Sequence, residues 1–219
     1  MTTLPLSLEH LVRPPKINTN KAAALFLFHG YGSNEADLFS FAPELPPELC
    51  VISVRAPYPM PPYGYAWYAI NFDANFGKWS DVEQAKKSVG KMVTFIKEAI
   101  EAYHLDTTKI SLLGFSQGTV LSLAIALSYP DMVHNVIGLS GYIDEKTLVE
   151  SYEKKDHSHL KMYISHGKAD PVIPFSWAQR TPAILEKLGI DYTFEEFPTG
   201  HGVSQENFYA MNTWLKKHI

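Results

Sequence analysis

A serine between two glycines is the residue of this chain best suited to nucleophilic chemistry. Ser116 stands in the motif G-F-S-Q-G at residues 114–118, which matches the pattern G-x-S-x-G. The apolar run I-S-L-L precedes it at 110–113, and an Ala/Leu-rich stretch that favours a helix follows at 119–129. Strand, glycine-flanked serine and helix together are typical of a nucleophile elbow, a strained turn that exposes the serine hydroxyl at the end of a sheet. The two glycines remove side chains that would collide across so tight a turn.

A serine hydroxyl is a poor nucleophile near neutral pH, so it needs a base within hydrogen-bond reach and a third group that orients the base. In folds with this elbow the partners follow the serine in the order acid, then histidine. Asp170 follows a predicted strand at 160–164, and His201 lies between two glycines after a predicted strand at 191–197. We therefore predict that Ser116, Asp170 and His201 form a catalytic triad.

Two other residues are alternatives for the base and the acid. Of the nine histidines, His166 also ends a predicted strand and is the main alternative base. His29 precedes the elbow in the chain, which favours a structural or oxyanion-loop role. Asp144 follows the preceding predicted strand and is the alternative acid. Asp170 precedes Pro171, and Asp-Pro is a common turn pair, but a turn at a strand end is compatible with the role of the acid.

Two backbone N–H groups are predicted to form an oxyanion hole. One belongs to Gln117, the residue after the nucleophile, and the other to the loop after an early strand. The sequence H-G-Y-G at 29–32 follows an apolar run at 22–28. We choose Tyr31 as the second donor because the glycines on both sides let the backbone turn inward. The alternative is that H-G-Y-G forms only a tight turn.

The segment 56–80 is rich in prolines and aromatic residues and has little periodicity. Proline at this density disfavours both a helix and a central strand, so we predict a long ordered loop. Loops of this length in compact domains are usually functional. Four aromatic residues are candidates for the wall of an apolar substrate pocket, namely Tyr63, Tyr65, Trp67 and Tyr68. The alternative is that their side chains only pack the loop onto the sheet.

Strands and helices alternate along the chain, which predicts one α/β domain over residues 1–219, with a doubly wound, mostly parallel sheet and helices on both faces. Further predicted strands cover 7–12 (at an edge), 51–54 and 133–139, and predicted helices cover 35–42, 80–103, 175–188 and a last stretch capped by Ser204. A capping box S-D-V-E at 80–83 starts the second helix. The polar segment 144–159 is a predicted surface excursion. The triad candidates all follow strands, so we expect them at the carboxyl edge of the sheet, where such sheets bind ligands.

The composition argues against several classes of partner. The chain has 46% hydrophobic and 19% charged residues and a net charge of −4, with scattered lysines and arginines, so neither a nucleic-acid partner nor stable membrane insertion is expected. One cysteine, Cys50, excludes an intrachain disulfide and suits a cytoplasmic location. The sequence predicts neither a signal peptide nor a transmembrane helix. Metal-ligand spacings and nucleotide-binding glycine motifs are missing, so no metal or cofactor is expected.

Four segments together resemble the phospholipase/carboxylesterase family of α/β-hydrolases, which includes acyl-protein thioesterases: L-F-H-G-Y-G-S-N-E-A-D-L, G-F-S-Q-G, S-H-G-K-A-D-P-V-I-P and T-G-H-G-V-S-Q-E. W-Y-A-I at 67–70 is also similar to that family's W-[FY]-D-[IL] segment. The motifs are more similar to those of bacterial carboxylesterases than to those of eukaryotic thioesterases. The resemblance implies an α/β-hydrolase fold with little or no cap domain and a serine hydrolase without a cofactor. Its implied site residues are Ser116, Asp170 and His201 as triad, with Tyr31 and Gln117 as oxyanion donors.

Two positions depart from the family's pattern. Thr119 stands where a further glycine often follows the motif, and Ala69 stands where an acidic residue is common, so a substrate contact or ion pair of that acid does not carry over. The expected function is hydrolysis of carboxylic esters of small to medium acyl chain through an acyl-enzyme at Ser116. The alternatives are a thioesterase or lysophospholipase acting on long-chain substrates and, less favoured, a non-catalytic binding protein on the same fold. A homodimer is compatible with the sequence but does not follow from it.

Overall fold

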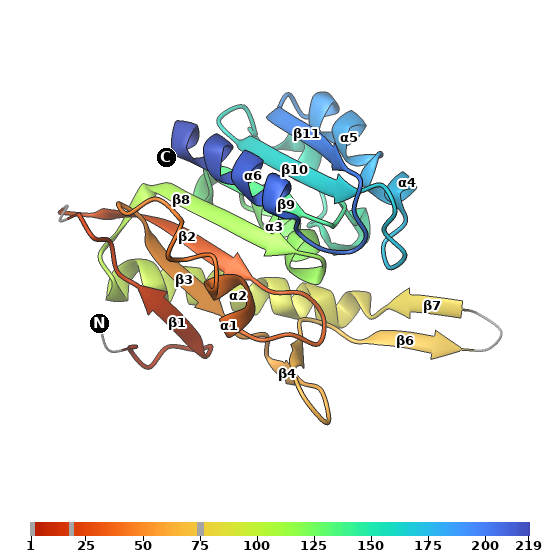
Figure 1. The fold of residues 1–219 in the computed structure, drawn as a ribbon, viewed down its shortest axis with the longest axis horizontal. Helices are drawn as coiled ribbons and strands as arrows, with labels where there is room; N and C mark the ends of the chain where they lie inside the picture. Colours follow the sequence, from red (N-terminus) through yellow and green to blue (C-terminus); the bar gives the residue numbers. More distant parts are fainter. Residues whose placement is uncertain (1–2, 18–19, 74–76) are drawn as a thin grey trace.

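A seven-stranded sheet forms the centre of the computed structural model, which describes residues 3–17, 20–73 and 77–219 (Figure 1). In spatial order the strands are β1 (His10–Arg13), β3 (Cys50–Val54), β2 (Ala22–Phe28), β8 (Leu105–Phe115), β9 (Asn135–Leu139), β10 (Lys161–Gly167) and β11 (Asp191–Phe197). The edge strand β1 is antiparallel to β3, and all other neighbours are parallel. The predicted mostly parallel sheet is therefore confirmed.

Helices cover both faces of this sheet (Figure 1). They are α1 (Ala36–Phe39), α2 (Val82–Ala102), α3 (Gln117–Ser128), α4 (Phe175–Ala178), α5 (Thr181–Lys187) and α6 (Gln205–His218), with 3-10 turns η1 (Pro130–Met132), η2 (Glu145–Thr147) and η3 (Tyr152–Lys154). Successive side chains of a strand point to opposite faces. Phe26 and Phe28 of β2 accordingly pack in one core with α2 and α3, whereas Leu25 and Leu27 pack in the other with α1 and α6. No helix in the described ranges is long and apolar enough to cross a membrane.

Helix α3, which follows Ser116, is buried at every residue. It packs on β8 and β9 on the sheet side and contacts α2, η2 and η3 on its other sides. A helix enclosed in this way has no polar face, which explains the uninterrupted Ala/Leu-rich sequence at 119–129. Because α3 is fixed on all sides, its first residue holds a fixed position relative to the end of β8.

Several predicted elements differ from the observed ones in their bounds. The edge strand predicted at 7–12 is β1, which starts at His10, and the apolar run at 110–113 is only part of the 11-residue strand β8. The helix predicted at 175–188 is divided into α4 and α5. Pro182 near the start of α5 explains the division, because proline has no N–H and its ring collides with the carbonyl four residues earlier.

The predicted helix caps are correct at one helix and wrong at the other. At α6, Ser204 is the N-cap, and its Oγ accepts a hydrogen bond from the Asn207 N–H at 3.2 Å, as predicted. At α2 the cap is Asp81, whose Oδ1 accepts from the Gln84 N–H at 2.9 Å. Ser80 instead ends the strand β7 (Gly77–Ser80), so the predicted capping box at 80–83 begins one residue too early.

The segment 56–80 contains two small hairpins, so the prediction of a loop without strands is wrong. Strand β4 (Tyr58–Pro59) pairs antiparallel with β5 (Tyr65–Ala66), and β6 (Ile70–Asp73) pairs antiparallel with β7. Proline excludes a central strand, but both strands of a two-stranded hairpin are edges, where a residue without an N–H is tolerated. The β6–β7 hairpin extends away from the main sheet (Figure 1). Residues 74–76 of the predicted loop lie outside the described residues.

The segment 144–159 is mostly exposed and contains only the 3-10 turns η2 and η3, in agreement with a surface excursion. Three residues depart from this description, because Thr147, Leu148 and His157 are buried. His157 is 2% exposed, and its Nε2 lies 3.0 Å from the Leu127 carbonyl oxygen at the end of α3. The excursion is therefore fastened to α3 by a buried imidazole.

Candidate active site

Ser116 lies in a tight turn between β8 and α3. Its backbone has φ 55° and ψ −115°, a conformation that is strained for a residue with a side chain. A Cβ added at Gly114 would overlap the backbone of Gly118, and a Cβ added at Gly118 would overlap the carbonyl group of Phe28. The Ser116 N–H donates to the Leu139 carbonyl of β9 at 2.9 Å. Glycine is therefore required on both sides of the serine, as the collision argument predicts.

Three side chains at the carboxyl edge of the sheet form one chain of hydrogen bonds. Asp170 follows β10, His201 follows β11, and Ser116 follows β8. The Asp170 Oδ2 lies 2.7 Å from the His201 Nδ1, and the His201 Nε2 lies 3.0 Å from the Ser116 Oγ. The Asp170 side chain is fully buried, whereas the His201 side chain keeps 16% of its surface exposed. The structure thus brings the three predicted triad residues together.

The Asp170 carboxylate is fixed by backbone donors as well as by the imidazole. Its Oδ1 accepts hydrogen bonds from the N–H groups of Val172 at 2.8 Å and Ile173 at 2.9 Å. Burial by itself raises the pKa of the Asp170 carboxyl, but the hydrogen bonds from His201, Ile173 and Val172 outweigh it, and the net pKa lies below the usual value. An ionised Asp170 accepts the His201 Nδ1–H, which leaves the Nε2 lone pair directed at the Ser116 hydroxyl.

The alternative base and acid do not contact the serine side chain. His166 is fully buried, and its Nε2 lies 3.0 Å from the Ile173 carbonyl oxygen and 3.3 Å from the Asp170 Oδ2. Asp144 caps η2, where its Oδ1 accepts from the Lys146 N–H at 3.2 Å. Within the described residues, neither His166 nor Asp144 makes a hydrogen bond to the Ser116 side chain or to His201. The geometry therefore favours His201 and Asp170.

The two predicted oxyanion donors are unpaired among the described residues. Neither the Tyr31 N–H nor the Gln117 N–H has a hydrogen-bond acceptor there. Gln117 is the first residue of α3, where N–H groups have no partner within the helix. Both N–H groups can therefore bind a ligand oxygen.

The four aromatic candidates for a pocket wall do not share one environment. Trp67 is fully buried and Tyr68 is 4% exposed, whereas Tyr63 is 87% exposed. Tyr65 is half-buried, with the Arg55 guanidinium 4.8 Å from the centre of its ring. Burial of Trp67 and Tyr68 agrees with the alternative in which these rings pack the segment onto the sheet. A pocket-lining role for the four stays a prediction.

Phe115 within the motif and Thr119 directly after it contribute contacts that the sequence does not predict. The Phe115 ring lies 5.0 Å from the His201 ring between centroids, so it supports the imidazole. The Thr119 Oγ1 lies 2.7 Å from the carbonyl oxygens of both Gly114 and Leu139, and a Cβ added at Gly141 would overlap the Thr119 side chain. The only signal for Phe115 in the sequence is its position next to Ser116. The only signal for Thr119 is that it replaces a glycine common in the family's pattern.

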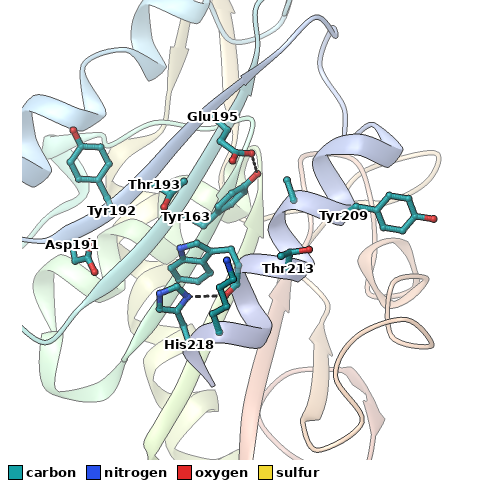
Figure 2. A pocket seen from close by; sticks show the side chains of 11 residues that line it. Tyr163, Asp191, Tyr192, Thr193, Glu195, Tyr209, Thr213 and His218 are labelled. Atoms are coloured by element: carbon teal, nitrogen blue, oxygen red, sulfur yellow. Dashed lines mark hydrogen bonds between the residues drawn. The ribbon is translucent and has the colours of Figure 1, made fainter.

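A cavity of about 530 Å³ lies between β11 and α6 (Figure 2). Aromatic side chains line much of it, including Tyr163, whose hydroxyl donates to the Glu195 carboxylate at 2.7 Å, and Trp214. None of the 11 lining residues is Ser116, Asp170 or His201. This cavity is therefore separate from the serine site.

The sheet order, the helices on both faces and the serine at the turn after β8 define an α/β-hydrolase. The model of the phospholipase/carboxylesterase family matches residues 14–219. The chain belongs to that family, as the motif resemblance predicts, and is a hydrolase of the carboxylic-ester class.

Individual relatives agree with this assignment. Acyl-protein thioesterase 1 of Yarrowia lipolytica is 29% identical over 222 residues, covering 95% of this chain and 96% of the relative. A probable carboxylesterase of Oryza sativa subsp. japonica is 28% identical over 162 residues, covering 68% of this chain and 61% of the relative. The fold is similar to that of the Bacillus cereus carboxylesterase, with a TM-score of 0.82 at 20% identity over 97% of this chain and 95% of the other. Esterase PE8 has a TM-score of 0.85 at 23% identity, covering 98% and 100% of the two chains.

Proposed function

We propose that this chain is a serine esterase that hydrolyses carboxylic esters of small to medium acyl chain through an acyl-enzyme at Ser116. The observation that carries the proposal is the unbroken chain of hydrogen bonds from Asp170 through His201 to Ser116, at 2.7 and 3.0 Å. It supplies a nucleophile, a base within reach of its proton and an acid that orients the base.

The reaction begins when the Ser116 Oγ attacks the ester carbonyl carbon and the His201 Nε2 accepts the hydroxyl proton. The carbonyl oxygen becomes an oxyanion, which accepts hydrogen bonds from the Tyr31 and Gln117 N–H groups. One donor of this kind contributes about 3–4 kcal/mol to transition-state stabilisation. The Asp170 carboxylate stabilises the imidazolium. His201 then protonates the leaving alcohol as the carbon–oxygen bond breaks, and the acyl group stays on Ser116.

The second half of the reaction repeats the same steps with water. The His201 Nε2 takes a proton from a water molecule as its oxygen attacks the acyl-enzyme carbonyl. The same two N–H groups hold the second oxyanion. Collapse of this intermediate releases the carboxylic acid, and the proton returns from His201 to the Ser116 Oγ. The cycle uses only protein groups and water, so we propose that a metal chelator leaves turnover unchanged.

Labelling with a fluorophosphonate tests the proposal, because this reagent forms a covalent bond only with an activated serine. Wild-type protein is expected to be labelled, and Ser116→Ala is not. Ser116→Ala should also lower kcat by about a million-fold, as loss of the nucleophile does in subtilisin. A folded wild-type protein that takes no label would contradict the proposal and favour a non-catalytic binding protein.

A thioesterase or lysophospholipase acting on long-chain substrates is the second candidate. The observation that favours it is the likeness to acyl-protein thioesterase 1 of Yarrowia lipolytica over 95% of this chain. The two candidates differ in substrate, so we would compare kcat/KM for p-nitrophenyl esters of increasing chain length and for an acyl-thioester. A maximum at short or medium esters supports the esterase. A maximum at long chains, or a faster thioester reaction, supports the second candidate.

We further propose that the protein works in the cytoplasm as one domain over residues 1–219, on a small-molecule ester. A free, buried Cys50, whose pKa burial raises to about 11, is compatible with a reducing compartment. Cell fractionation tests the location, and a single cooperative unfolding transition tests the domain count. Light scattering in solution distinguishes a monomer from a homodimer.

A further inference from the structure

The imidazole of His29 is held in one tautomer next to the proposed oxyanion donor. His29 is fully buried at the end of β2. Its Nε2 accepts a hydrogen bond from the Ala56 N–H at 3.0 Å, so in the neutral ring the proton resides on Nδ1. That nitrogen lies 2.7 Å from the Gly30 carbonyl oxygen and donates to it. Burial lowers the pKa of His29, which favours the neutral ring.

The hydrogen bond from His29 fixes the direction of the Tyr31 N–H. The Gly30 carbonyl and the Tyr31 N–H belong to one planar trans peptide, in which they point in opposite directions. Because the carbonyl is held toward the His29 imidazole, the N–H is held away from it. The Ser33 N–H also donates to the Gly30 carbonyl, at 3.3 Å. Rotation of this peptide would break both bonds.

Trp67 connects the same loop to the helix that carries the other donor. Its Nε1–H donates to the His29 carbonyl at 2.9 Å, and its ring lies 5.6 Å from the His29 ring between centroids. Its backbone N–H donates to the Gln117 Oε1 at 3.1 Å, and the Gln117 Nε2 donates to the Tyr68 carbonyl at 2.8 Å. The Trp67 carbonyl accepts a hydrogen bond from the Ser88 hydroxyl of α2.

We propose that His29, Trp67 and the Gln117 side chain form a buried brace that positions both oxyanion donors, the N–H groups of Tyr31 and Gln117. His29 and Trp67 are positioning residues, because they act on the oxyanion only through the backbone. The proposal rests on the proposed function, since it requires an oxyanion at Ser116. The brace explains why a tryptophan with no exposed surface lies in the proline-rich segment: two of its hydrogen-bonding groups hold His29 and Gln117, and its carbonyl accepts a bond from Ser88 of α2.

Trp67→Phe tests the brace, because it removes the Nε1–H and keeps an aromatic ring. Donors that act on an oxyanion stabilise the transition state rather than bound substrate, so we expect kcat to fall by about 10- to 100-fold and KM to change by less than about threefold. Affinity for an alkyl trifluoromethyl ketone, which adds to Ser116 and carries an oxyanion, should fall by a similar factor. Trp214→Phe is the matched control, since Trp214 lies against Tyr163 and His218 on α6 and should keep wild-type kcat.

A second variant and a measurement on the wild-type protein make the test independent of the folding of Trp67→Phe. Gln117→Met keeps the backbone N–H and removes both side-chain hydrogen bonds, so the same pattern is expected. In wild-type protein at neutral pH, the ¹⁵N NMR spectrum should show His29 as the Nδ1–H tautomer. The Nε2–H tautomer, or a folded variant with wild-type kcat and inhibitor affinity, overturns the brace. If wild-type protein itself takes no fluorophosphonate and cleaves no ester, the proposed function fails instead.

Discussion

The two sides of Ser116 are built from different kinds of group. On one side, the His201 imidazole contacts the Ser116 hydroxyl and the Asp170 carboxylate contacts the imidazole, both through side-chain atoms from loops after β11 and β10. On the other side the proposed donors are backbone N–H groups of Tyr31 and Gln117, whose position depends on other, buried side chains. A substitution on the first side removes a reacting group, whereas a substitution on the second side only displaces one. We therefore expect abrupt losses on the base side and graded losses on the oxyanion side.

His201→Ala tests the base side most severely. Without an imidazole, no described residue hydrogen-bonds to the Ser116 hydroxyl to accept its proton, so kcat should fall by about a million-fold, as for the equivalent loss in subtilisin. Stopped assays with a p-nitrophenyl ester measure the residual rate, and fluorophosphonate labelling should be lost. His159→Ala is the control, because His159 contacts the Pro130 carbonyl far from the triad. Residual activity within about 100-fold of wild type would mean that another residue is the base.

Asp170→Asn should reduce kcat by about ten thousand-fold, because an amide does not hold the imidazole in the required tautomer and leaves the imidazolium without a counter-charge. The expected loss is smaller than for His201→Ala, since the proton acceptor is still present. A pH profile of kcat/KM for wild type and variant measures the effect. Asp144→Asn, at the alternative acid, should behave as wild type, and the opposite ranking of these two variants would contradict the assignment.

Gly118→Ala displaces the backbone on the oxyanion side. Its Cβ would overlap the Phe28 carbonyl, so we expect a loss of about 1–3 kcal/mol in the free energy of unfolding, together with a lower kcat. Gly90→Ala is the matched control: Gly90 lies inside α2 with open space where a Cβ would be added, and alanine should stabilise by about 0.5–1 kcal/mol. Urea unfolding measures both. Equal effects of the two substitutions would contradict a tight elbow.

Acid should weaken the base side by a smaller, gradual amount. The pKa of Asp170 in the folded protein lies below its usual value of 3.8, so the folded state binds this proton less readily than the unfolded state. The resulting stabilisation is fully present above pH 3.8 and is lost as the pH falls through the lower folded-state value. Urea unfolding of wild type and Asp170→Asn between pH 7 and pH 3 should show a difference that shrinks toward acid. A constant difference would show that the carboxylate is not stabilised in its ionised form.

Elements that end at a local sequence signal, such as a glycine or proline turn, are predictable from the sequence. Strands β2 (Ala22–Phe28) and β11 (Asp191–Phe197) have the predicted bounds, because an apolar or alternating run ends directly at a turn containing glycine or proline. Ser116, Asp170 and His201 are also predictable from the sequence, since the order serine, acid, histidine and the placement after strands restrict the choice.

Features that depend on distant partners were not predictable in this way. The hairpins in 56–80 were missed because hydrogen-bond pairing, rather than composition, creates them. The contact of Trp67 with His29 joins residues 38 positions apart, and the sequence around one residue gives no sign of the other. Pro182 is a sequence signal for the division between α4 and α5, but the apolar spacing on both sides of it favours a single helix.

Thr119 and Gly141 share one small volume behind the serine, and this has a consequence for how the sequence can evolve. While residue 119 is threonine, any side chain at 141 overlaps it, so position 141 is closed to change. A glycine at 119, frequent in the family's pattern, would remove that overlap and leave a Cβ at 141 in close contact only with the Ser116 carbonyl oxygen, at 3.1 Å. The two substitutions are therefore tolerated in one order only, first at 119 and then at 141. Once both have occurred, threonine can return at 119 only after glycine has returned at 141, so the history of one position constrains the other.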